Sequence, residues 1–496
     1  MPESLLSFIL PVHEPDSILF DKVLKALCVQ SLHEWEAVFV LDGPNDDARK
    51  AIERAFKKVP NNFRVIELEH GGAQKARNAG FPYSKGNYVV FLDSDIVMEP
   101  HTAKAWVEIL DKSPEYGFVY SGYRFLGEKG AIESQPFDPF TLRCRNYISS
   151  CFPFRRELFP GWEESLESLQ DWSFWLSIVG KGARGKFLQG FAWSTAYPTL
   201  TSISGKGCTP DKWLYRMDKV KALHGIPIRE VCFTSLHNRL DAIALAKAAD
   251  ADYQDHPNDK PNHYKTIIQI GFSVRPGEFE RCAEAWGPQH KKIIFWSAED
   301  VEDIYDTVAK RALDRYSERV NMACKQYVED LAAKKIMSGA GFNVEVLSLP
   351  VISKEEVLPL PAEPVFLVDV TATYGHVFNA IQKSIPDIKL EMAGGTKKME
   401  KFTGLISFYQ DRLVRPGIKR MLAAGRHVVS NVQAPFCGYI NDRVSDATFL
   451  RDFVGKIREA AKAPQGLEAV RYYIDPRRLD KFKETINASQ LHNTNV

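Results

Sequence analysis

Residues 86–95, GNYVVFLDSD, decide the fold of the N-terminal half of this chain. The five residues from Tyr88 to Leu92 form a continuous apolar run, which is typical of a strand buried on both faces of a sheet. Two carboxylates follow at once, in the turn Asp93-Ser94-Asp95. Because loops at the carboxyl ends of parallel strands form the ligand crevice of an α/β protein, this stretch predicts a buried strand that delivers two acidic side chains to a binding site.

The sequence before this stretch alternates strands and helices. Strands are predicted at LSFILPV (6–12), at EAVFVLD and at RVIELE. Apolar residues at helical spacing predict helices between them, over 16–30, 48–57 and 73–79. This order predicts an α/β fold with a mostly parallel sheet, in which Glu14, Asp42 and Asp93 all follow strand ends.

The composition is that of a folded protein without a strong overall charge. The 496 residues are 45% hydrophobic and 26% charged, which is enough for more than one hydrophobic core. Lys and Arg total 64, Asp and Glu total 63, and the formal net charge is +1. The whole chain therefore lacks the basic excess that drives sequence-independent binding to nucleic acids or anionic membranes.

We expect a cytoplasmic protein. The apolar runs are far shorter than the ~20 residues that a membrane helix needs. The N-terminus, MPESLLSFILPVHEPD, has no positive region before its apolar stretch, so it reads as a first strand rather than a signal peptide. The eight cysteines form no CxxC pair, which is typical of buried thiols in a reducing compartment.

A polar stretch is predicted to divide the chain into two domains. Residues 249–263, ADADYQDHPNDKPNH, are rich in Asp and Pro and lack apolar periodicity, as a linker does. The predicted parts are a first domain at 1–248, this linker, a second α/β domain at 264–487 and a disordered tail at 488–496.

The second domain restarts the alternation of strands with helix-length segments. KTIIQIGF and KKIIFWSAED are predicted strands, and a long helical stretch is predicted from Ile304 to Met337. The pattern predicts one or two Rossmann-like lobes, divided near 355–363.

Asp93 and Asp95 have the spacing of a site for a hard divalent cation. Two carboxylates one residue apart on a turn can share one Mn²⁺ or Mg²⁺ ion, which would bridge to phosphate oxygens. The alternative is a helix N-cap or a solvated turn, since this pattern also occurs by chance in unrelated proteins.

Four segments in order, FILPVHEPD, VLDGPNDD, GGAQKARNAG and GNYVVFLDSD, resemble the nucleotide-sugar half of family 2 glycosyltransferases with the GT-A fold. The resemblance implies that Pro11, Val12 and Glu14 hold the nucleoside together with Asp42, which would accept a hydrogen bond from the base. The family's usual D-D-G-S-x-D turn is here LDGPND (41–46), so one acidic residue is missing and the base stays open.

The same resemblance implies a place for the diphosphate and the ribose. The family's G-x-x-x-A-R-N-x-G helix, which packs beneath the nucleotide, is matched by Gly72, Ala76, Arg77, Asn78 and Gly80. Arg77 would lie near the phosphates, and Asp93, Ser94 and Asp95 match the turn that binds metal and ribose. Taken alone, Arg77 could equally be a surface cation on an amphipathic helix, and Asp42 a turn residue.

The segment CFPFRRELFPGWEESLESLQDWSFWLSIVGKG (151–182) resembles the acceptor half of the family. The family's Glu-Asp dipeptide is here Gln170-Asp171, and the resemblance implies that Asp171 is the general base that takes a proton from the acceptor hydroxyl. The alternative is a simple negative charge in the first turn of a helix.

Two more features follow from the resemblance. His224 would complete the metal shell, although a lone histidine is more often structural. A loop with Gly205, Lys206 and Gly207 would close over the diphosphate. The chain lacks the Q-x-x-R-W signature and the membrane helices of the family's processive polymerases, so we expect transfer of a single sugar.

The C-terminal half more faintly resembles the paired Rossmann lobes of GT-B glycosyltransferases. MAGGTKKMEK and IKRMLAAGRHVVSNVQAPFCGYIND resemble a nucleotide lobe, in which Gly394, Gly395 and Lys397 would approach a diphosphate. A charged turn is the alternative, because the spacing of a P-loop is absent. The pattern fits a lobe that binds the acceptor or mediates dimerisation as well as it fits a second active site.

The sequence thus predicts an inverting, metal-dependent glycosyltransferase that uses a nucleoside-diphosphate sugar, most simply a UDP-sugar. Its acceptor would be a hydroxyl of a glycan, a protein or a modified nucleobase. The alternatives are a bifunctional enzyme with two active halves and a non-catalytic protein that binds sugars or nucleotides.

Overall fold

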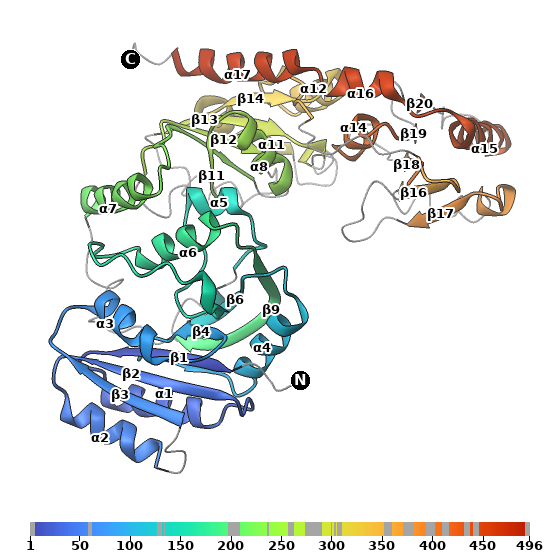
Figure 1. Cartoon of the computed structure of the whole chain (residues 1–496). Helices are drawn as coiled ribbons and strands as arrows, with labels where there is room; N and C mark the ends of the chain where they lie inside the picture. The colour runs from blue at the N-terminus through green and yellow to red at the C-terminus, as the bar shows by residue number, and fades with distance from the viewer. Residues whose placement is uncertain are drawn as a thin grey trace. The chain divides into compact units, whose positions relative to one another are not determined.

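The chain divides into two compact units, Met1–Ile228 and Arg229–Val496 (Figure 1). The computed structural model describes residues 5–57, 62–125, 131–132, 134–196, 209–235, 238–255, 262–272, 290–298, 300–301, 304, 310–351, 360–370, 381–392, 402–408, 416–430, 437–439 and 446–491. Both units are α/β structures with parallel strands, which confirms the predicted fold class.

The N-terminal unit is built on one mixed sheet, whose strand order is β3-β2-β1-β4-β8-β6-β9-β5 with β7 paired to β6. Its strands are β1 (Leu6–Val12), β2 (Trp35–Asp42), β3 (Phe63–Leu68), β4 (Tyr88–Phe91), β5 (Ile96–Met98), β6 (Phe118–Phe125), β7 (Ala131–Ile132), β8 (Phe154–Arg155) and β9 (Gly185–Ala196). The pairs among β3, β2, β1 and β4 are parallel. Because β2 and β4 lie on opposite sides of β1, the carboxyl ends of β1 and β4 flank a topological switch point, where α/β proteins bind ligands.

Helices cover both faces of this sheet. They are α1 (Ser17–Cys28), α2 (Asp46–Ala55), α3 (Ala73–Gly80), α4 (Thr102–Lys112), α5 (Pro139–Cys144), α6 (Gln170–Gly180) and α7 (Pro210–Leu223). The helices α1 and α2 begin at side-chain caps, because Asp16 accepts from Leu19 N and Asn45 accepts from Ala48 N. Figure 1 shows α1 and α2 on one face of the parallel strands and α3 on the other.

An aromatic cluster joins three elements that the candidate site needs. Phe91 at the end of β4 meets the rings of Trp162 and Phe174 edge-on, at centroid distances of 5.2 and 5.9 Å. Trp162 and Phe174 stack on one another at 4.4 Å. These contacts fix β4, the loop that contains Trp162 and helix α6 relative to one another.

The C-terminal unit contains two parallel sheets, with strand orders β11-β10-β12-β13-β14-β15 and β17-β16-β18-β19-β20. The strands are β10 (Val231–Thr234), β11 (Asp252–Tyr253), β12 (Thr266–Ile270), β13 (Lys291–Trp296), β14 (Lys325–Val328), β15 (Glu345–Val346), β16 (Val365–Val370), β17 (Lys389–Met392), β18 (Gly404–Phe408), β19 (His427–Ser430) and β20 (Gly438–Tyr439). The helices are α8 (Arg239–Ala248), α11 (Lys310–Ala323), α12 (Leu331–Gly339), α14 (Pro416–Ala423), α15 (Asp446–Lys462), α16 (Leu467–Tyr473) and α17 (Pro476–Leu491). Of the one or two Rossmann-like lobes that the sequence predicts, the structure has two, and the chain passes from one sheet to the other after Val346 and before Val365.

The boundary between the units differs from the predicted one. The boundary in the sequence falls between Ile228 and Arg229, so β10 and α8 belong to the C-terminal unit rather than to a domain that ends at 248. The predicted linker at 249–263 contains β11, which pairs with β10 inside the sheet. A polar loop between two strands has the same composition as a linker, so composition alone misplaced the boundary.

Two other expectations are corrected in the C-terminal unit. The stretch from Ile304 to Met337 is not one helix, because strand β14 separates α11 from α12. The predicted tail at 488–496 starts inside α17, which runs to Leu491.

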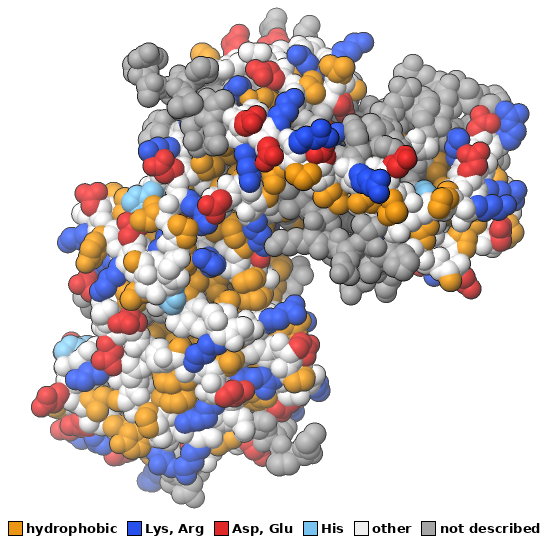
Figure 2. Space-filling model, turned by 45° about the horizontal axis from the view of Figure 1, so that its top comes forward, with side chains coloured by type: hydrophobic (Ala, Val, Ile, Leu, Met, Phe, Trp, Pro, Cys, Tyr) orange, Lys and Arg blue, Asp and Glu red, His pale blue; other side chains and the backbone are white. Residues whose placement is uncertain are grey.

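Basic and acidic side chains are interspersed on the face shown in Figure 2. This distribution agrees with the formal net charge of +1.

Gly80 lets helix α3 approach the sheet closely. A Cβ atom at Gly80 would lie 2.7 Å from Cγ2 of Ile9 and 2.8 Å from Cγ2 of Val40, on two neighbouring strands. We predict that Gly80→Ala lowers the free energy of unfolding by about 1–3 kcal/mol, as overpacking of a tight core does.

The matched control for this variant is Gly180→Ala at the end of α6, where a Cβ atom would meet nothing within 4 Å. Urea unfolding of both variants measures the difference. Equal stability of the two would contradict the close-packing role of Gly80.

Candidate active site

The turn Asp93-Ser94-Asp95 lies between β4 and β5, at the switch point of the sheet. All three side chains are partly exposed, although the residues of β4 are buried. Burial raises the pKa of Asp95 to about 6, and the neighbouring charge of Asp93 contributes to this rise. The two carboxylates therefore lie close enough to repel one another, which is the arrangement that a divalent cation relieves.

Arg77 lies buried between Asp93 and Trp162. Its Nη2 donates to Oδ1 of Asp93 at 2.6 Å, and its guanidinium carbon lies 4.4 Å from the centroid of the Trp162 ring. The side chain of Arg77 is only 9% exposed. The other carboxylate oxygen of Asp93 accepts from Ser150 Oγ at 3.3 Å. Arg77 thus fixes Asp93 from beneath and is not a surface cation.

Asn78 holds the neighbouring loop. Its amide donates to the carbonyl of Trp162 at 2.9 Å and to Oε1 of Glu164 at 2.8 Å, and its Oδ1 accepts from Trp162 N at 2.7 Å. Two motifs that lie far apart in the sequence, ARN (76–78) and GWEE (161–164), are therefore joined by paired hydrogen bonds. The side-chain amide of Asn78 is engaged with protein groups.

Asp171 lies in the first turn of α6. Its Oδ2 accepts from Nδ2 of Asn146 at 2.8 Å, and its Oδ1 accepts from Trp172 N at 2.9 Å. The Nδ2 atom of Asn146 faces Asp171, because Oδ1 on the other side of the same amide accepts from Ile148 N at 3.2 Å.

Burial is the main cause that raises the pKa of Asp171 above its ordinary value. The hydrogen bonds from Trp172 and Asn146 oppose this shift. The charges of Arg77 and Asp93 also act on the pKa of Asp171, the first lowering it and the second raising it. The fold therefore brings Asp171 into the same electrostatic neighbourhood as Asp93, although 78 positions separate them in the sequence.

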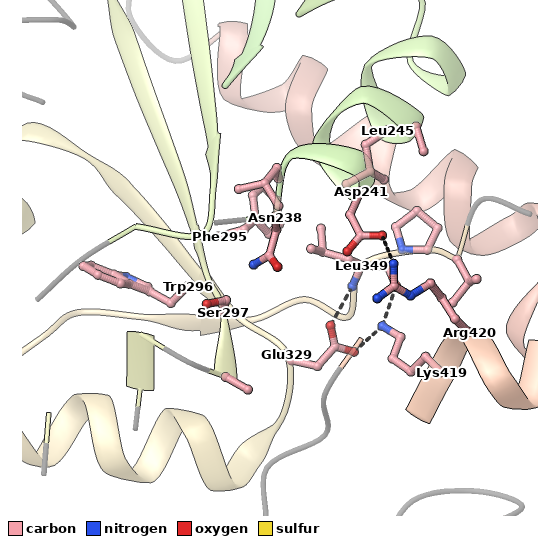
Figure 3. A pocket seen from close by; sticks show the side chains of 16 residues that line it. Asn238, Asp241, Leu245, Phe295, Trp296, Ser297, Glu329, Leu349, Lys419 and Arg420 are labelled. Atoms are coloured by element: carbon pink, nitrogen blue, oxygen red, sulfur yellow. Dashed lines mark hydrogen bonds and ion pairs between the residues drawn. The ribbon is translucent and has the colours of Figure 1, made fainter. Parts of the chain in front are cut away.

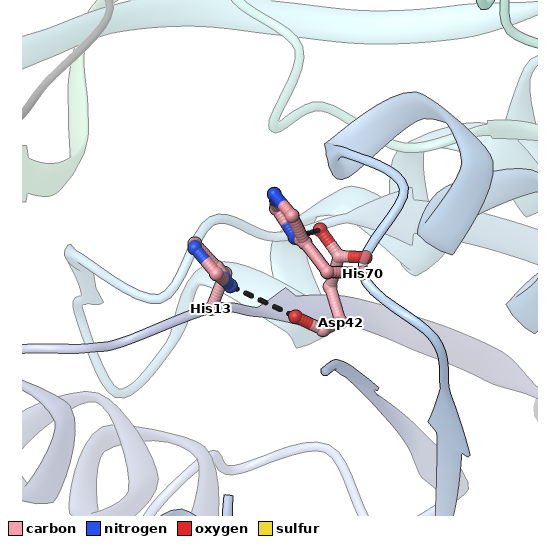
Figure 4. Close-up of side chains that lie close together, drawn as sticks. All are labelled: His13, Asp42 and His70. Carbon is pink, nitrogen blue, oxygen red and sulfur yellow. Dashed lines mark hydrogen bonds and ion pairs between the residues drawn. The ribbon is translucent and has the colours of Figure 1, made fainter. Parts of the chain in front are cut away.

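Asp42, at the end of β2, is buried beneath two stacked histidines (Figure 4). Its carboxylate accepts from Gly71 N at 2.7 Å, from Gly72 N at 3.0 Å and from Nδ1 of His70 at 3.1 Å. The carbonyl of Asp42 accepts from Nδ1 of His13 at 2.8 Å. The rings of His13 and His70 stack with their centroids 4.1 Å apart.

This arrangement limits what Asp42 can offer to a ligand. A carboxylate has about four acceptor positions, and three of them are taken, so about one remains. Gly72 has a φ of 94°, a conformation that favours glycine, and its N–H is used by Asp42. The group of His13, Asp42 and His70 also has the spacing of a metal site, but none of its atoms belongs to the Asp93 turn.

The apolar residues at the end of β1 are buried in the sheet. Pro11 and Val12 are buried within the strand and pair with Val40 and Leu41 of β2. Glu14 is exposed and has a φ of 41°, which residues other than glycine rarely adopt. Strained backbone of this kind tends to occur at functional sites, so the bend at Glu14 agrees with a ligand crevice there.

His224 does not join the two aspartates. It is the C-cap of α7, and its Nε2 lies 2.9 Å from Oγ of Ser173. Within the part of the chain that the structure describes, Asp93, Asp95 and His224 do not bring three ligand atoms together. The predicted loop residues Gly205, Lys206 and Gly207 lie outside the described residues, as do Gly394, Gly395 and Lys397.

Sequence reasoning missed several residues of this site, namely His13, His70, Asn146, Ser150 and Trp162. His13 follows the first strand, and His70 precedes the two glycines that cradle Asp42, so their positions gave a signal. Asn146 and Ser150 lie in a segment without periodicity, and nothing in the sequence pairs them with Asp171 and Asp93.

Comparison with known proteins identifies the N-terminal part of the chain. Residues 7–168 match the sequence model of the family described as Glycosyl transferase family 2. The match includes the Asp93 turn, Arg77 and Asp42 and ends shortly before Asp171. The N-terminal unit therefore contains a family 2 glycosyltransferase domain.

Individual relatives agree with this class. An uncharacterized glycosyltransferase of Rickettsia felis is 26% identical over 191 residues, which are 35% of this chain and 31% of that protein. Another, MJ1057 of Methanocaldococcus jannaschii, is 20% identical over 205 residues, which are 38% of this chain and 70% of that protein. The chain thus spans less than a third of the length of the Rickettsia relative.

Among solved structures, S. aureus TarS 1-349 in complex with UDP-GlcNAc is 20% identical, covering 51% of this chain and 68% of that chain. The TM-score is 0.37, which is too low to establish a common overall fold. No helix in the described residues of the present chain is long and apolar enough to cross a membrane.

The raised pKa of Asp95 predicts a pH-dependent stability of the metal-free protein. The pKa of Asp95 rises from 3.8 to about 6 on folding, so its ionised form lowers the free energy of unfolding. This loss of stability is absent below pH 4, where Asp95 is protonated, and reaches its full size above pH 6. We predict that Asp95→Asn stabilises the protein in EDTA by about 2 kcal/mol at pH 7.5.

Urea unfolding of the full chain at pH 4 and pH 7.5 measures this effect. At pH 4 the difference between Asp95→Asn and the natural sequence should be much smaller. A stability difference that is independent of pH would contradict the repulsion between Asp93 and Asp95.

Proposed function

We propose that this protein is an inverting, metal-dependent glycosyltransferase that moves one sugar from a nucleoside-diphosphate donor, in the first instance a UDP-sugar, to a hydroxyl acceptor. One observation carries the proposal: Asp171 lies within electrostatic reach of Arg77 and Asp93 at the switch point of a family 2 glycosyltransferase domain. The proposed base and the proposed donor-binding turn would thereby lie close to one another.

The donor end of the site is the turn from Asp93 to Asp95. Its carboxylates fit Mg²⁺ or Mn²⁺, because the ligand atoms are oxygens and the two charges repel one another without a cation. When bound, such an ion would offset the charge that develops on the leaving diphosphate. Ser94, between the two aspartates, would face the same donor.

The nucleoside would lie against the ends of β1 and β2. Support comes from the bend at Glu14, from the exposed side chains of His13 and His70, and from the acceptor position that remains on Asp42. An N–H of a pyrimidine base is a suitable donor to that position. Pro11, Val12, Gly72 and Asn78 would act by shaping this wall rather than by binding the nucleoside with their side chains.

Asp171 would activate the acceptor. Its carboxylate takes the proton from the acceptor hydroxyl while that oxygen attacks the anomeric carbon, and the bond from this carbon to the diphosphate oxygen breaks on the opposite face. The raised pKa of Asp171 suits a base, because a more basic carboxylate accepts a proton more readily. Asn146 would keep the second carboxylate oxygen in place.

The C-terminal unit would hold the acceptor or a second copy of the chain.

We propose that the protein is located in the cytoplasm. This proposal is supported by the six free cysteines among the described residues, which form no disulfides with one another. His224 would take part in metal binding only if donor binding rearranged α7, because Ser173 engages it in this structure.

The function is tested by incubating the full chain with a panel of UDP-sugars and GDP-sugars and by measuring nucleotide release and sugar transfer. We predict turnover that requires Mn²⁺ or Mg²⁺ and stops in EDTA. Asp171→Asn should still bind the donor but should lose transfer by a factor of at least ~100, the low end of what a general base contributes.

The matched control for this experiment is Glu167→Gln. Glu167 lies four positions before Asp171, and its side chain is 81% exposed. Transfer by Asp171→Asn within a few-fold of the Glu167→Gln control would show that another residue is the base. Turnover that persists in EDTA would contradict the role of the metal.

Asn146 is predicted to be a positioning residue. Asn146→Ala removes a hydrogen bond that favours the charged form of Asp171, so the pKa of Asp171 should rise. The acid side of the pH profile of kcat should therefore move to higher pH, and kcat should fall by about tenfold, as for one lost hydrogen bond to a charged group. An unchanged pH profile would contradict this role, and Asn146→Gln should restore part of the activity.

A further inference from the structure

The C-terminal unit has a cavity at the switch point of its first sheet. In this sheet β11 pairs with one side of β10, and β12 pairs with the other side. The strand order therefore reverses at β10, and a crevice opens between the ends of β10 and β12. The cavity is lined there by Asn238 after β10, Gly271 after β12, Ser297 after β13 and Glu329 after β14 (Figure 3). Its enclosed volume is about 90 Å³, and it measures about 730 Å³ when the space open to solvent is included.

The rim of this cavity is held in place by buried hydrogen bonds. Oδ2 of Asp300 accepts from Phe272 N at 2.7 Å and from both N and Oγ of Ser297 at 2.8 Å, and this joins the ends of β12 and β13. Gly271 has a φ of 68°, and a Cβ atom there would lie 2.9 Å from Nδ2 of Asn238. The bare backbone of Gly271 therefore leaves room for the carboxamide of Asn238.

Among the described residues, the charges that line the cavity cancel. The ionisable ones are two acids and two bases: Asp241, Glu329, Lys419 and Arg420. Lys419 Nζ binds Oε1 of Glu329 at 2.6 Å and the carbonyl of Leu349 at 2.7 Å, so its donors are largely used. Nη1 of Arg420 lies 3.5 Å from Oδ1 of Asp241. A site for a diphosphate would need cations in excess, and the described residues that line this cavity do not supply them.

The rest of the lining combines apolar walls with planar polar groups. Leu245 and Val351 are among the apolar residues that line it, whereas the ring of Trp296 points away from Asn238 and Asp241 (Figure 3). Figure 3 shows the side chains of Asn238, Asp241 and Glu329 around the same space. An amide and a carboxylate hydrogen-bond well to neighbouring hydroxyls, and apolar side chains pack against the C–H groups of a sugar ring.

From this lining we infer that the cavity binds a neutral saccharide. The inference rests on the proposed function and deepens it, since a saccharide held by the C-terminal unit identifies the acceptor as a glycan rather than a protein or a nucleobase. The sugar would contact Asn238 and Asp241 with its hydroxyl groups.

The test uses the full chain and the methyl glycosides of glucose, galactose, N-acetylglucosamine and rhamnose, with binding measured by saturation-transfer NMR and titration calorimetry. At least one glycoside should bind. Its affinity should change by less than about tenfold between 0.05 and 0.5 M NaCl, because the ligand carries no charge. Asn238→Ala and Asp241→Asn should each weaken its binding by about tenfold, the effect of one lost hydrogen bond.

Leu240→Ala is the matched control, because Leu240 lies in the same turn of α8 and is 71% exposed. This variant should bind the glycoside as the natural chain does. All three variants should release nucleotide from the UDP-sugar at an unchanged rate in the absence of acceptor, since none of these residues belongs to the site at Asp93.

The inference is overturned if none of the four glycosides binds, or if binding is the same in Asn238→Ala, Asp241→Asn and the control. It is also overturned if UDP binds in this cavity, with an affinity that falls with salt and is lost on Arg420→Ala, because that result identifies a second nucleotide site. If a glycoside binds as expected but no donor is turned over, the proposed transferase function fails while the saccharide site stands.

Discussion

The ion pair between Arg77 and Asp93 is the contact on which the N-terminal site depends. The guanidinium is buried between a carboxylate at the end of β4 and the ring of Trp162, so it cannot move without leaving a charge unpaired. The same loop is held by Asn78, one position further along α3. Helix α3, strand β4 and the loop before α6 are thereby fixed together at the point where donor and acceptor would meet.

This constraint also explains why the conspicuous residues of α3 need not touch a ligand. Ala76 and Gly80 are buried against the sheet, and Gly80 has no room for a Cβ atom. Arg77 and Asn78 bind protein groups on the opposite side. The motif supports the crevice, and the groups exposed to the donor come from the ends of the neighbouring strands.

The two units use the same sheet geometry with different charges. At the N-terminal switch point Asp93 repels Asp95 and pairs with the buried Arg77, and the charges of Arg77 and Asp93 also act on Asp171. The two neighbouring carboxylates of Asp93 and Asp95 would suit a divalent cation. Among the described residues, the C-terminal switch point balances two acids against two bases, which would suit an uncharged ligand. One sheet geometry would thus serve two kinds of site, and the side chains at the strand ends would determine which.

The sequence by itself determined the α/β class, the four parallel strands β1 to β4 of the N-terminal sheet and the acidic turn at 93–95, because hydrophobic periodicity and strand-end residues are local properties. It predicted one or two Rossmann-like lobes for the C-terminal unit, without deciding between these numbers. It could not place the boundary at 228, since a loop inside a sheet and a linker have the same composition. Only the tertiary structure showed that Asn146 orients Asp171, that His13 and His70 cover Asp42 and that Asn238 shares a cavity with Lys419. These pairs join residues far apart in the chain, and such contacts arise from packing, which no local pattern records.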